Sequence, residues 1–67
     1  MYIDQKKIVL RLCLCCIDVK DLAEKSGVPV PTVYRIMGNQ GKIKVRTSTA
    51  GKIARALGVD VTEILAD

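Results

Sequence analysis

The stretch that decides the fold is Leu22-Ala23-Glu24-Lys25-Ser26-Gly27-Val28-Pro29-Val30-Pro31-Thr32-Val33-Tyr34-Arg35-Ile36. Within it, Gly27, Val28 and Pro29 separate two amphipathic segments. Glycine readily adopts the left-handed backbone conformation that ends many helices, so Gly27 predicts a helix end. Two helices joined by so short a glycine-containing connection cross steeply. The stretch therefore predicts a helix-turn-helix.

Both helices of this motif have boundary signals. The first begins at Asp18, whose carboxylate can accept hydrogen bonds from the free N–H groups of a helix start. The second covers about residues 30–37, with Val33 and Ile36 facing inward at a three-residue spacing. Pro31 fits there because a proline in the first helical turn sacrifices no hydrogen bond.

Three further helices are predicted around the motif. One runs from the N-cap Asp4 to residue 15 or 16, and another begins between residues 47 and 49 and ends at Gly58. The last begins at Asp60, which has capping-box spacing with Glu63. Since 67 residues suffice for one small core, we expect a compact all-α domain of five helices that occupies residues 1–67.

The segment Lys42-Ile43-Lys44-Val45-Arg46 alternates strictly between cations and apolar residues. In an extended backbone this alternation places the cations on one side and the apolar residues on the other. A single strand has no partner in an all-helical domain, so we interpret the segment as an extended loop held by Ile43 and Val45.

Basic residues are concentrated in the middle of the chain, although the net charge is only +4. No acidic residue lies between Glu24 and Asp60. Such a one-sided block is typical of a surface that binds phosphate groups, and its alternative interpretation is an ordinary solvated charged face. The basic residues of this block are Lys25, Arg35, Lys42, Lys44, Arg46, Lys52 and Arg55.

Three cysteines, Cys13, Cys15 and Cys16, lie close together in the first predicted helix. An odd number in one helix gives no disulfide framework, and the chain has no histidine to complete a zinc site. We expect small buried thiols in a reducing cytosol; the alternative is a soft-metal or redox role.

The region from residue 8 to residue 17 is apolar apart from Arg11, but it is too short to cross a bilayer. It also lacks the small-residue cleavage pattern of a signal peptide. The sequence therefore predicts a cytoplasmic protein without membrane contact.

The motif resembles the helix-turn-helix of the lambda Cro and lambda repressor (XRE-like) family. The resemblance rests on Leu22-Ala23-x3-Gly27-Val28-x3-Thr32-Val33-x-Arg35-Ile36 and continues into Ile53-Ala54-x-Ala56-Leu57-Gly58-Val59. It covers about residues 8–66 and implies a lambda-repressor-like fold that binds double-stranded DNA. A weaker resemblance to the lac-repressor headpiece fits less well, because here a helix precedes the motif and the loop after it is longer.

The resemblance implies which residues read the DNA bases. In the family the second helix of the motif lies in the major groove. The matching positions here are Val30, Pro31, Tyr34 and Arg35. Arg35 is the best candidate for sequence recognition, because a guanidinium group fits the two acceptors on the major-groove edge of guanine.

Two departures from the family pattern shift the expected mode of recognition. Many members carry Gln or Asn where this chain has Val30 and Pro31, which favours DNA shape and water-mediated contacts over direct reading of bases. At the position of Val19, members of the family often have a Gln that binds a DNA phosphate. We expect polar residues after the turn to contact the DNA backbone and to fix the register without reading sequence. They are Thr32, Asn39, Lys42, Lys44, Arg46, Thr47 and Ser48.

A dimer that reads a palindromic operator is a further implication of the resemblance. An apolar first helix requires a second surface against which to bury its outer side. We expect Leu10, Leu14 and Cys15 to lie largely outside the core as a dimer surface, with Leu65 of the last helix as its rival. The simpler alternative is that the last helix covers this apolar side. The residues of the first helix expected to face the core are Val9, Leu12, Cys13 and Cys16.

The sequence thus predicts a transcriptional regulator, in particular a Cro-like repressor, whose partners are double-stranded DNA and a second copy of the chain. The alternative is a protein-interaction module that kept the fold and lost specific DNA recognition. We expect no enzymatic activity, since no nucleophile–base pair is evident. No cofactor, metal or small-molecule ligand is indicated either.

Overall fold

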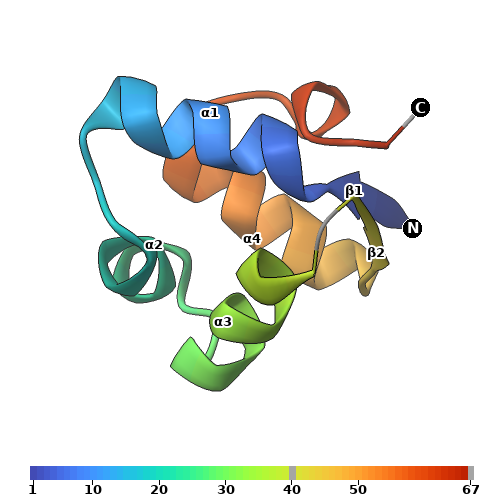
Figure 1. Ribbon diagram of the computed structural model, residues 1–67, viewed down its shortest axis with the longest axis horizontal. Helices are drawn as coiled ribbons and strands as arrows, with labels where there is room; N and C mark the ends of the chain where they lie inside the picture. The colour runs from blue at the N-terminus through green and yellow to red at the C-terminus, as the bar shows by residue number, and fades with distance from the viewer. Residues whose placement is uncertain (40, 67) are drawn as a thin grey trace.

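The computed structural model describes residues 1–39 and 41–66, and in these it contains four α-helices, one short 3-10 helix and a two-stranded antiparallel sheet (Figure 1). Helix α4 runs through the middle, with α1 on one side and α2 and α3 on the other (Figure 1). The elements in chain order are β1 (Tyr2–Asp4), α1 (Gln5–Cys15), α2 (Val19–Ser26), α3 (Val30–Gly38), β2 (Lys42–Lys44), α4 (Thr47–Leu57) and the 3-10 helix η1 (Val61–Glu63).

The helix-turn-helix is confirmed by the local geometry of α2 and α3. The Asp18 carboxylate accepts from the Asp21 backbone N–H at 2.8 Å, and the Asp21 side chain accepts from the Asp18 backbone N–H, so the two form a capping box. Gly27 ends α2 with φ of 73°, a conformation that side-chain-bearing residues rarely adopt. Helix α3 then starts directly after Pro29.

One aliphatic core holds all of the elements together. Its fully buried members come from both ends of the chain as well as from the motif. Val33 and Ile36 anchor α3 as predicted, while Ile53 and Leu57 contribute from α4. The largest fully buried side chains are Ile3, Ile8, Leu22, Val33, Ile36, Ile53 and Ile64. Burial of each such side chain contributes about 1.5–3 kcal/mol, so the core fixes how α3 is presented.

The expectation of an all-α fold is wrong, because residues 42–44 do find a partner strand. β2 pairs with β1, and Ile43 lies opposite Ile3 in the register. Both isoleucines are buried, while Lys42 and Lys44 alternate outward. The interpretation as a loop failed because the partner strand lies about 40 residues away at the N-terminus. The prediction that Ile43 and Val45 hold the segment is confirmed, because both side chains are buried.

The fifth predicted helix is only the single 3-10 turn η1. The Asp60 carboxylate accepts from the backbone N–H of Thr62 at 3.0 Å, so it caps the turn, but the predicted capping box with Glu63 does not form. The Glu63 side chain instead accepts from Arg11 at 2.8 Å. Ile64 is fully buried, whereas Leu65 is only partly buried.

The predicted burial of the thiols is also wrong. Leu12 does face the core, but Cys13 and Cys16 are exposed and Val9 is only partly buried, while Ile8 takes the second inward position of α1. Cys15 is exposed too, although its sulfur lies 3.9 Å from the Leu57 carbonyl oxygen. A helix that is apolar on every side gives no polar face from which to derive its orientation.

Among the described helices, none has the length and apolar character required to cross a membrane.

Candidate nucleic-acid interface

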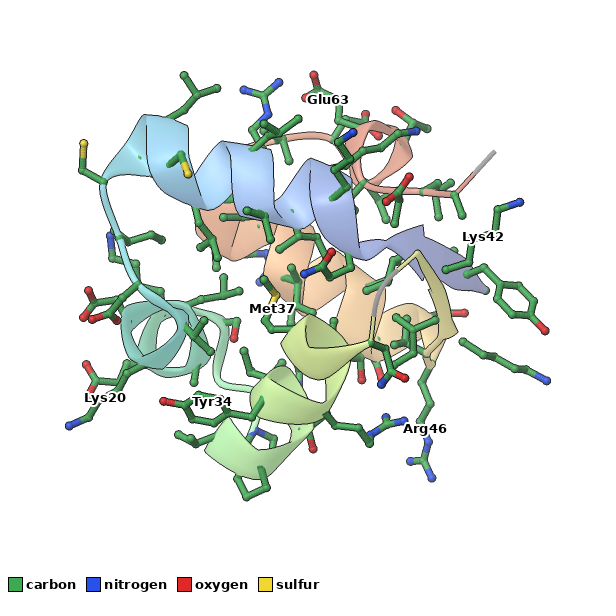
Figure 2. All side chains as sticks on the ribbon, viewed as in Figure 1. Lys20, Tyr34, Met37, Lys42, Arg46 and Glu63 are labelled. Atoms are coloured by element: carbon green, nitrogen blue, oxygen red, sulfur yellow. The ribbon has the colours of Figure 1, made fainter. Side chains whose placement is uncertain are left out.

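The outer side of α3 carries the four residues expected to read bases. Val30, Pro31, Tyr34 and Arg35 are all exposed, with Tyr34 at 56% and Val30 at 38% exposure. They project from the molecule because the opposite side of the helix is sealed into the core. Figure 2 shows Tyr34 on the side of the molecule opposite Glu63. Helix α3 thus offers a short exposed ridge to a ligand.

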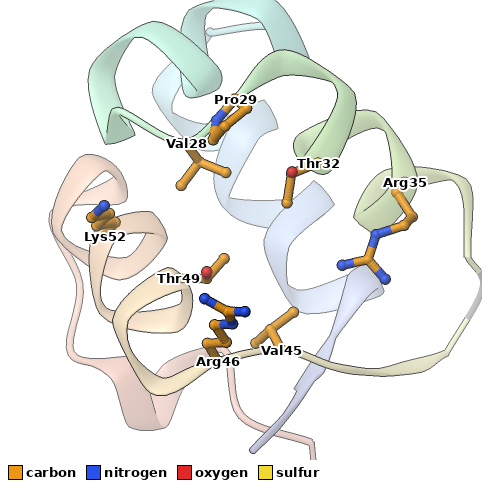
Figure 3. Close-up of a pocket in the computed structure, with 8 residues that line it drawn as sticks. All are labelled: Val28, Pro29, Thr32, Arg35, Val45, Arg46, Thr49 and Lys52. Carbon is orange, nitrogen blue, oxygen red and sulfur yellow. The ribbon is translucent and has the colours of Figure 1, made fainter.

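A surface cavity of about 260 Å³ opens beside this ridge, between α3 and α4. Arg35 lines it from α3, while Arg46 and Lys52 line it from the start and the middle of α4 (Figure 3). Its other lining residues are Val28, Pro29, Thr32, Val45 and Thr49. We call these eight residues the α3–α4 cavity.

The α3–α4 cavity is cationic and contains no carboxylate among its lining residues. Three positive groups around one small space repel each other, and a bound anion would relieve that repulsion. The hydroxyl groups of Thr32 and Thr49 add hydrogen-bond donors on opposite walls (Figure 3). A phosphate group has the charge and acceptor oxygens that match this lining.

The geometry of α4 explains why these groups converge. Arg46, Thr49 and Lys52 are three residues apart, so they share one side of the helix. The opposite side, including Ala50 and Ile53, is buried. No side chain caps the start of helix α4. Its first backbone hydrogen bond runs from the Ala50 N–H to the Arg46 carbonyl oxygen, so the N–H groups before Ala50 have no partner within the helix. The positive end of this helix thus adjoins the cavity.

Strand β2 and the start of α4 extend the cationic surface. Lys44, Arg46 and Thr47 line a second, shallower depression together with Met1, Arg35 and Val45. Figure 2 places Arg46 on the side of α3, whereas Lys42 lies beside the N-terminal strand, away from the α3 ridge. The structure therefore brings Lys44 to the candidate interface and leaves Lys42 at its edge.

The other residues predicted to contact the DNA backbone also differ in how close they lie to the α3 ridge. Thr32 lines the α3–α4 cavity, and Ser48 is exposed in the first turn of α4. The Asn39 amide donates to the Arg35 carbonyl oxygen at 2.6 Å, so it closes the last turn of α3. Its role as a phosphate ligand stays a prediction, as do the other assigned contacts.

Sequence reasoning did not assign Thr49 or Lys52 to the interface. Lys52 was recognised only as part of the basic block, and Thr49 only as a candidate helix start. The spacing of Arg46, Thr49 and Lys52 held a usable signal, because residues three apart in a helix share a face. What the spacing could not reveal is that this face lies opposite Arg35.

The exposed thiols do not form a metal-ligand cluster with other groups. In the described part of the chain, no three side chains of His, Cys, Asp or Glu are placed to hold a metal ion. The Arg11–Glu63 ion pair lies on the α1 side of the molecule, far from the α3–α4 cavity (Figure 2).

A steeply crossed pair of helices whose second member projects beside a cationic cavity defines a helix-turn-helix nucleic-acid-binding module. The family model of the Cro/C1-type HTH DNA-binding domain matches residues 16–67, and this chain belongs to that family. It is therefore a DNA-binding domain of the kind that regulates transcription. The matched segment begins after α1 and includes α2, α3 and α4.

Two solved structures share the fold with a TM-score of 0.82 at 22% sequence identity: native PhpD with cadmium atoms, and PhpD with cadmium complexed with hydroethylphosphonate. The alignment covers 100% of this chain but 14% of each of those chains. At this identity the likeness concerns the fold alone. The chain matches none of the curated proteins with which it was compared.

Proposed function

We propose that this chain is a repressor that binds a palindromic operator as a homodimer. The observation that supports the proposal best is the position of the exposed α3 ridge beside the cationic α3–α4 cavity. In a duplex, the major groove and the flanking phosphates are adjacent in the same way. One copy of α3 covers one half-site, so a palindrome requires two copies.

In this proposal α3 enters the major groove and Arg35 carries most of the base discrimination. Its guanidinium group can donate two parallel hydrogen bonds to guanine. Because Arg35 also lines the α3–α4 cavity, it lies at the boundary between bases and phosphates. Val30 and Pro31 offer only apolar surface, which suits thymine methyl groups, and Tyr34 can pack against a methyl group or donate to a phosphate.

The α3–α4 cavity receives one backbone phosphate in this arrangement. Arg46 and Lys52 supply charge, Thr49 supplies a hydroxyl donor, and the free N–H groups at the start of α4 supply further donors. These groups fix the register of the protein on DNA. The cavity also replaces the phosphate contact that the family often makes through Gln at the position of Val19.

Repression follows if the bound dimer blocks access of polymerase to the promoter. The proposal assigns no catalytic step to the chain, whose sequence has no histidine and no evident nucleophile–base pair. It places the site of action in the cytoplasm, together with the DNA. Turnover of any substrate that depends on Cys13 or Cys16 would contradict the non-catalytic part of the proposal.

The proposal is tested by selection of binding sites from random duplexes, followed by gel-shift titration over a salt series. We expect selected sites with two inverted half-sites and an affinity that falls linearly in logarithmic plots against salt. Single, non-repeated selected sites would contradict the dimer on a palindrome. Absence of a site-specific shift at every salt concentration would favour the alternative of a protein-interaction module.

A further inference from the structure

Helix α3 begins with an end that has almost no capacity for hydrogen bonding. Pro29, Val30 and Pro31 carry no polar group in their side chains, and Pro31 has no backbone N–H. The backbone N–H groups of Thr32 and Val33 both donate to the Pro29 carbonyl oxygen, at 3.0 and 3.1 Å. The backbone N–H of Val30 is therefore the one donor that this helix end has left for a base.

The same helix end is accessible to a ligand. Val30 is 38% exposed, and Pro31 is exposed beside it. Tyr34 follows Val30 by four residues, so its ring extends the apolar surface along one row of the helix. Thr32, the polar residue of the first turn, lines the α3–α4 cavity instead (Figure 3). An exposed apolar end of this kind gains free energy only when it covers another apolar group.

We propose that the start of α3 recognises the C5-methyl group of a pyrimidine, and that the chain therefore distinguishes 5-methylcytosine from cytosine. The inference rests on the proposed function, in which α3 lies in the major groove, and it names the chemical group that this helix end recognises. In unmodified DNA, the methyl group of thymine is the apolar group that base pairs present in the major groove. 5-Methylcytosine carries the same group at the same ring position.

The discrimination has a simple physical cause. A methyl group that contacts Val30 and Pro31 leaves water without losing a hydrogen bond, so its burial stabilises the complex. In cytosine a hydrogen atom takes the place of the methyl group, and the contact is lost. A polar base atom at this place would lose its bound water and find no replacement in these two side chains, which costs free energy.

The position of Arg35 predicts where the methyl group lies in the operator. Pro31 and Arg35 are four residues apart, so their Cβ atoms are about 5–6 Å from each other on one side of α3. This separation corresponds to about two base-pair steps of roughly 3.4 Å. The recognised methyl group thus lies within about two base pairs of the guanine that Arg35 contacts. Methylation of a cytosine at this place strengthens binding, and operator occupancy then depends on the methylation state of the DNA.

Duplexes that differ by a single methyl group test the inference. In the operator selected from random duplexes, each thymine is replaced in turn by uracil, which removes only the methyl group. We expect about fourfold weaker binding at one position of each half-site, since burial of one carbon contributes about 0.8 kcal/mol. With a C·G pair at the same position, the duplex with 5-methylcytosine should bind about fourfold tighter than the duplex with cytosine.

Two results would overturn the inference. One is an affinity that stays unchanged when any thymine is replaced by uracil, together with equal binding of methylated and unmethylated cytosine. The other is a selected operator that has no thymine within about two base pairs of the guanine recognised by Arg35.

A protein variant tests which residues recognise the methyl group. Val30→Ala combined with Pro31→Ala shortens the apolar helix end, and the chain stays folded because both positions are exposed and alanine favours helices. The ratio between the affinities for the thymine and uracil operators should fall from about fourfold to less than twofold. Lys44→Ala is the control, because loss of a phosphate contact weakens binding to both duplexes and leaves their ratio unchanged. A ratio of fourfold in the double variant would overturn the assignment to Val30 and Pro31.

The outcomes separate this inference from the proposed function. A palindromic operator whose binding does not respond to methyl groups would overturn the methyl recognition and leave the repressor standing. Absence of any specific operator would overturn both.

Discussion

The surface around α3 and the outer side of α1 are both exposed, yet they carry opposite chemistry. Around α3, Arg35, Arg46 and Lys52 surround a small cavity without a carboxylate. On α1, Leu10 and Leu14 form an apolar row. The first surface attracts an anion from solution, whereas the second gains free energy only when another apolar surface covers it.

Exposure by itself does not identify the ligand of a surface, whereas the charge and polarity of its side chains do. Both surfaces rest on the same core and belong to a chain of 67 residues, so each can be altered while the other serves as its control.

The two sides of α1 should differ most in their contribution to stability. Leu12 is 6% exposed, and Leu12→Ala leaves a cavity that should lower the free energy of unfolding by about 2–5 kcal/mol. Leu14→Ala alters only the outer row and should change it by less than about 0.5 kcal/mol. Urea unfolding followed by circular dichroism measures both. A large loss for Leu14→Ala would show that the outer row is covered within the monomer.

Arg35→Ala should affect recognition on the α3 side and leave the fold intact, because Arg35 is exposed. Loss of a bidentate contact with guanine should reduce the binding free energy at the best operator by about 1–3 kcal/mol. It should also relax the sequence preference at one base position. Competition binding with single-base variants of the selected site measures this effect. Unchanged binding to the best operator would contradict the assignment of Arg35 to the groove.

Lys44 and Lys42 provide a matched pair on one strand. Lys44 lines the shallow depression beside Arg46, so Lys44→Ala should weaken binding evenly for all duplexes and reduce the salt slope by about 1. Lys42→Ala should have a smaller effect, because Lys42 lies away from the α3 ridge (Figure 2). Gel shifts over a salt series compare the two variants. Equal reductions would mean that the duplex extends along the whole strand.

The smallest effect is expected at Asp60, remote from the α3 ridge. Hydrogen bonds from the backbone N–H and then the hydroxyl of Thr62 lower the pKa of Asp60 below its ordinary value of 3.8. Because the pKa is lower in the folded state, this cap stabilises the fold above the unfolded-state value and is lost as the pH falls through the folded-state value. Asp60→Ala should therefore lower stability slightly at pH 7, with a smaller difference under acidic conditions. Unfolding curves at both pH values test this, and DNA affinity should not change.

The sequence predicted the elements whose signals lie within a few residues. The capping box at Asp18, the glycine at position 27 and the inward spacing of Val33 and Ile36 all act inside one or two helical turns. They were sufficient for the helix-turn-helix and for the family. The exposed ridge of α3 followed, because the inward residues of a helix determine its outward ones.

Sequence reasoning failed where partners are distant. The pairing of Ile3 with Ile43 joins strands about 40 residues apart. Each strand is so short that its own sequence does not predict a partner. In α1 the run from residue 8 to residue 15 is apolar apart from Arg11, so the helical wheel wrongly placed Cys13 in the core, where the structure has Ile8. A buried isoleucine removes more apolar surface from water than a thiol does, and that difference oriented the helix.

The sequence by itself determined the helix boundaries of the motif, the basic middle of the chain and the family, because capping, turn formation and charge are properties of neighbouring residues. Only the tertiary structure decided that Arg35 and Lys52 line one cavity, that a small sheet joins the N-terminus to the region after α3, and that Cys13 and Cys16 stay outside the core. These features arise from the burial of one shared core, and that burial depends on every element at once.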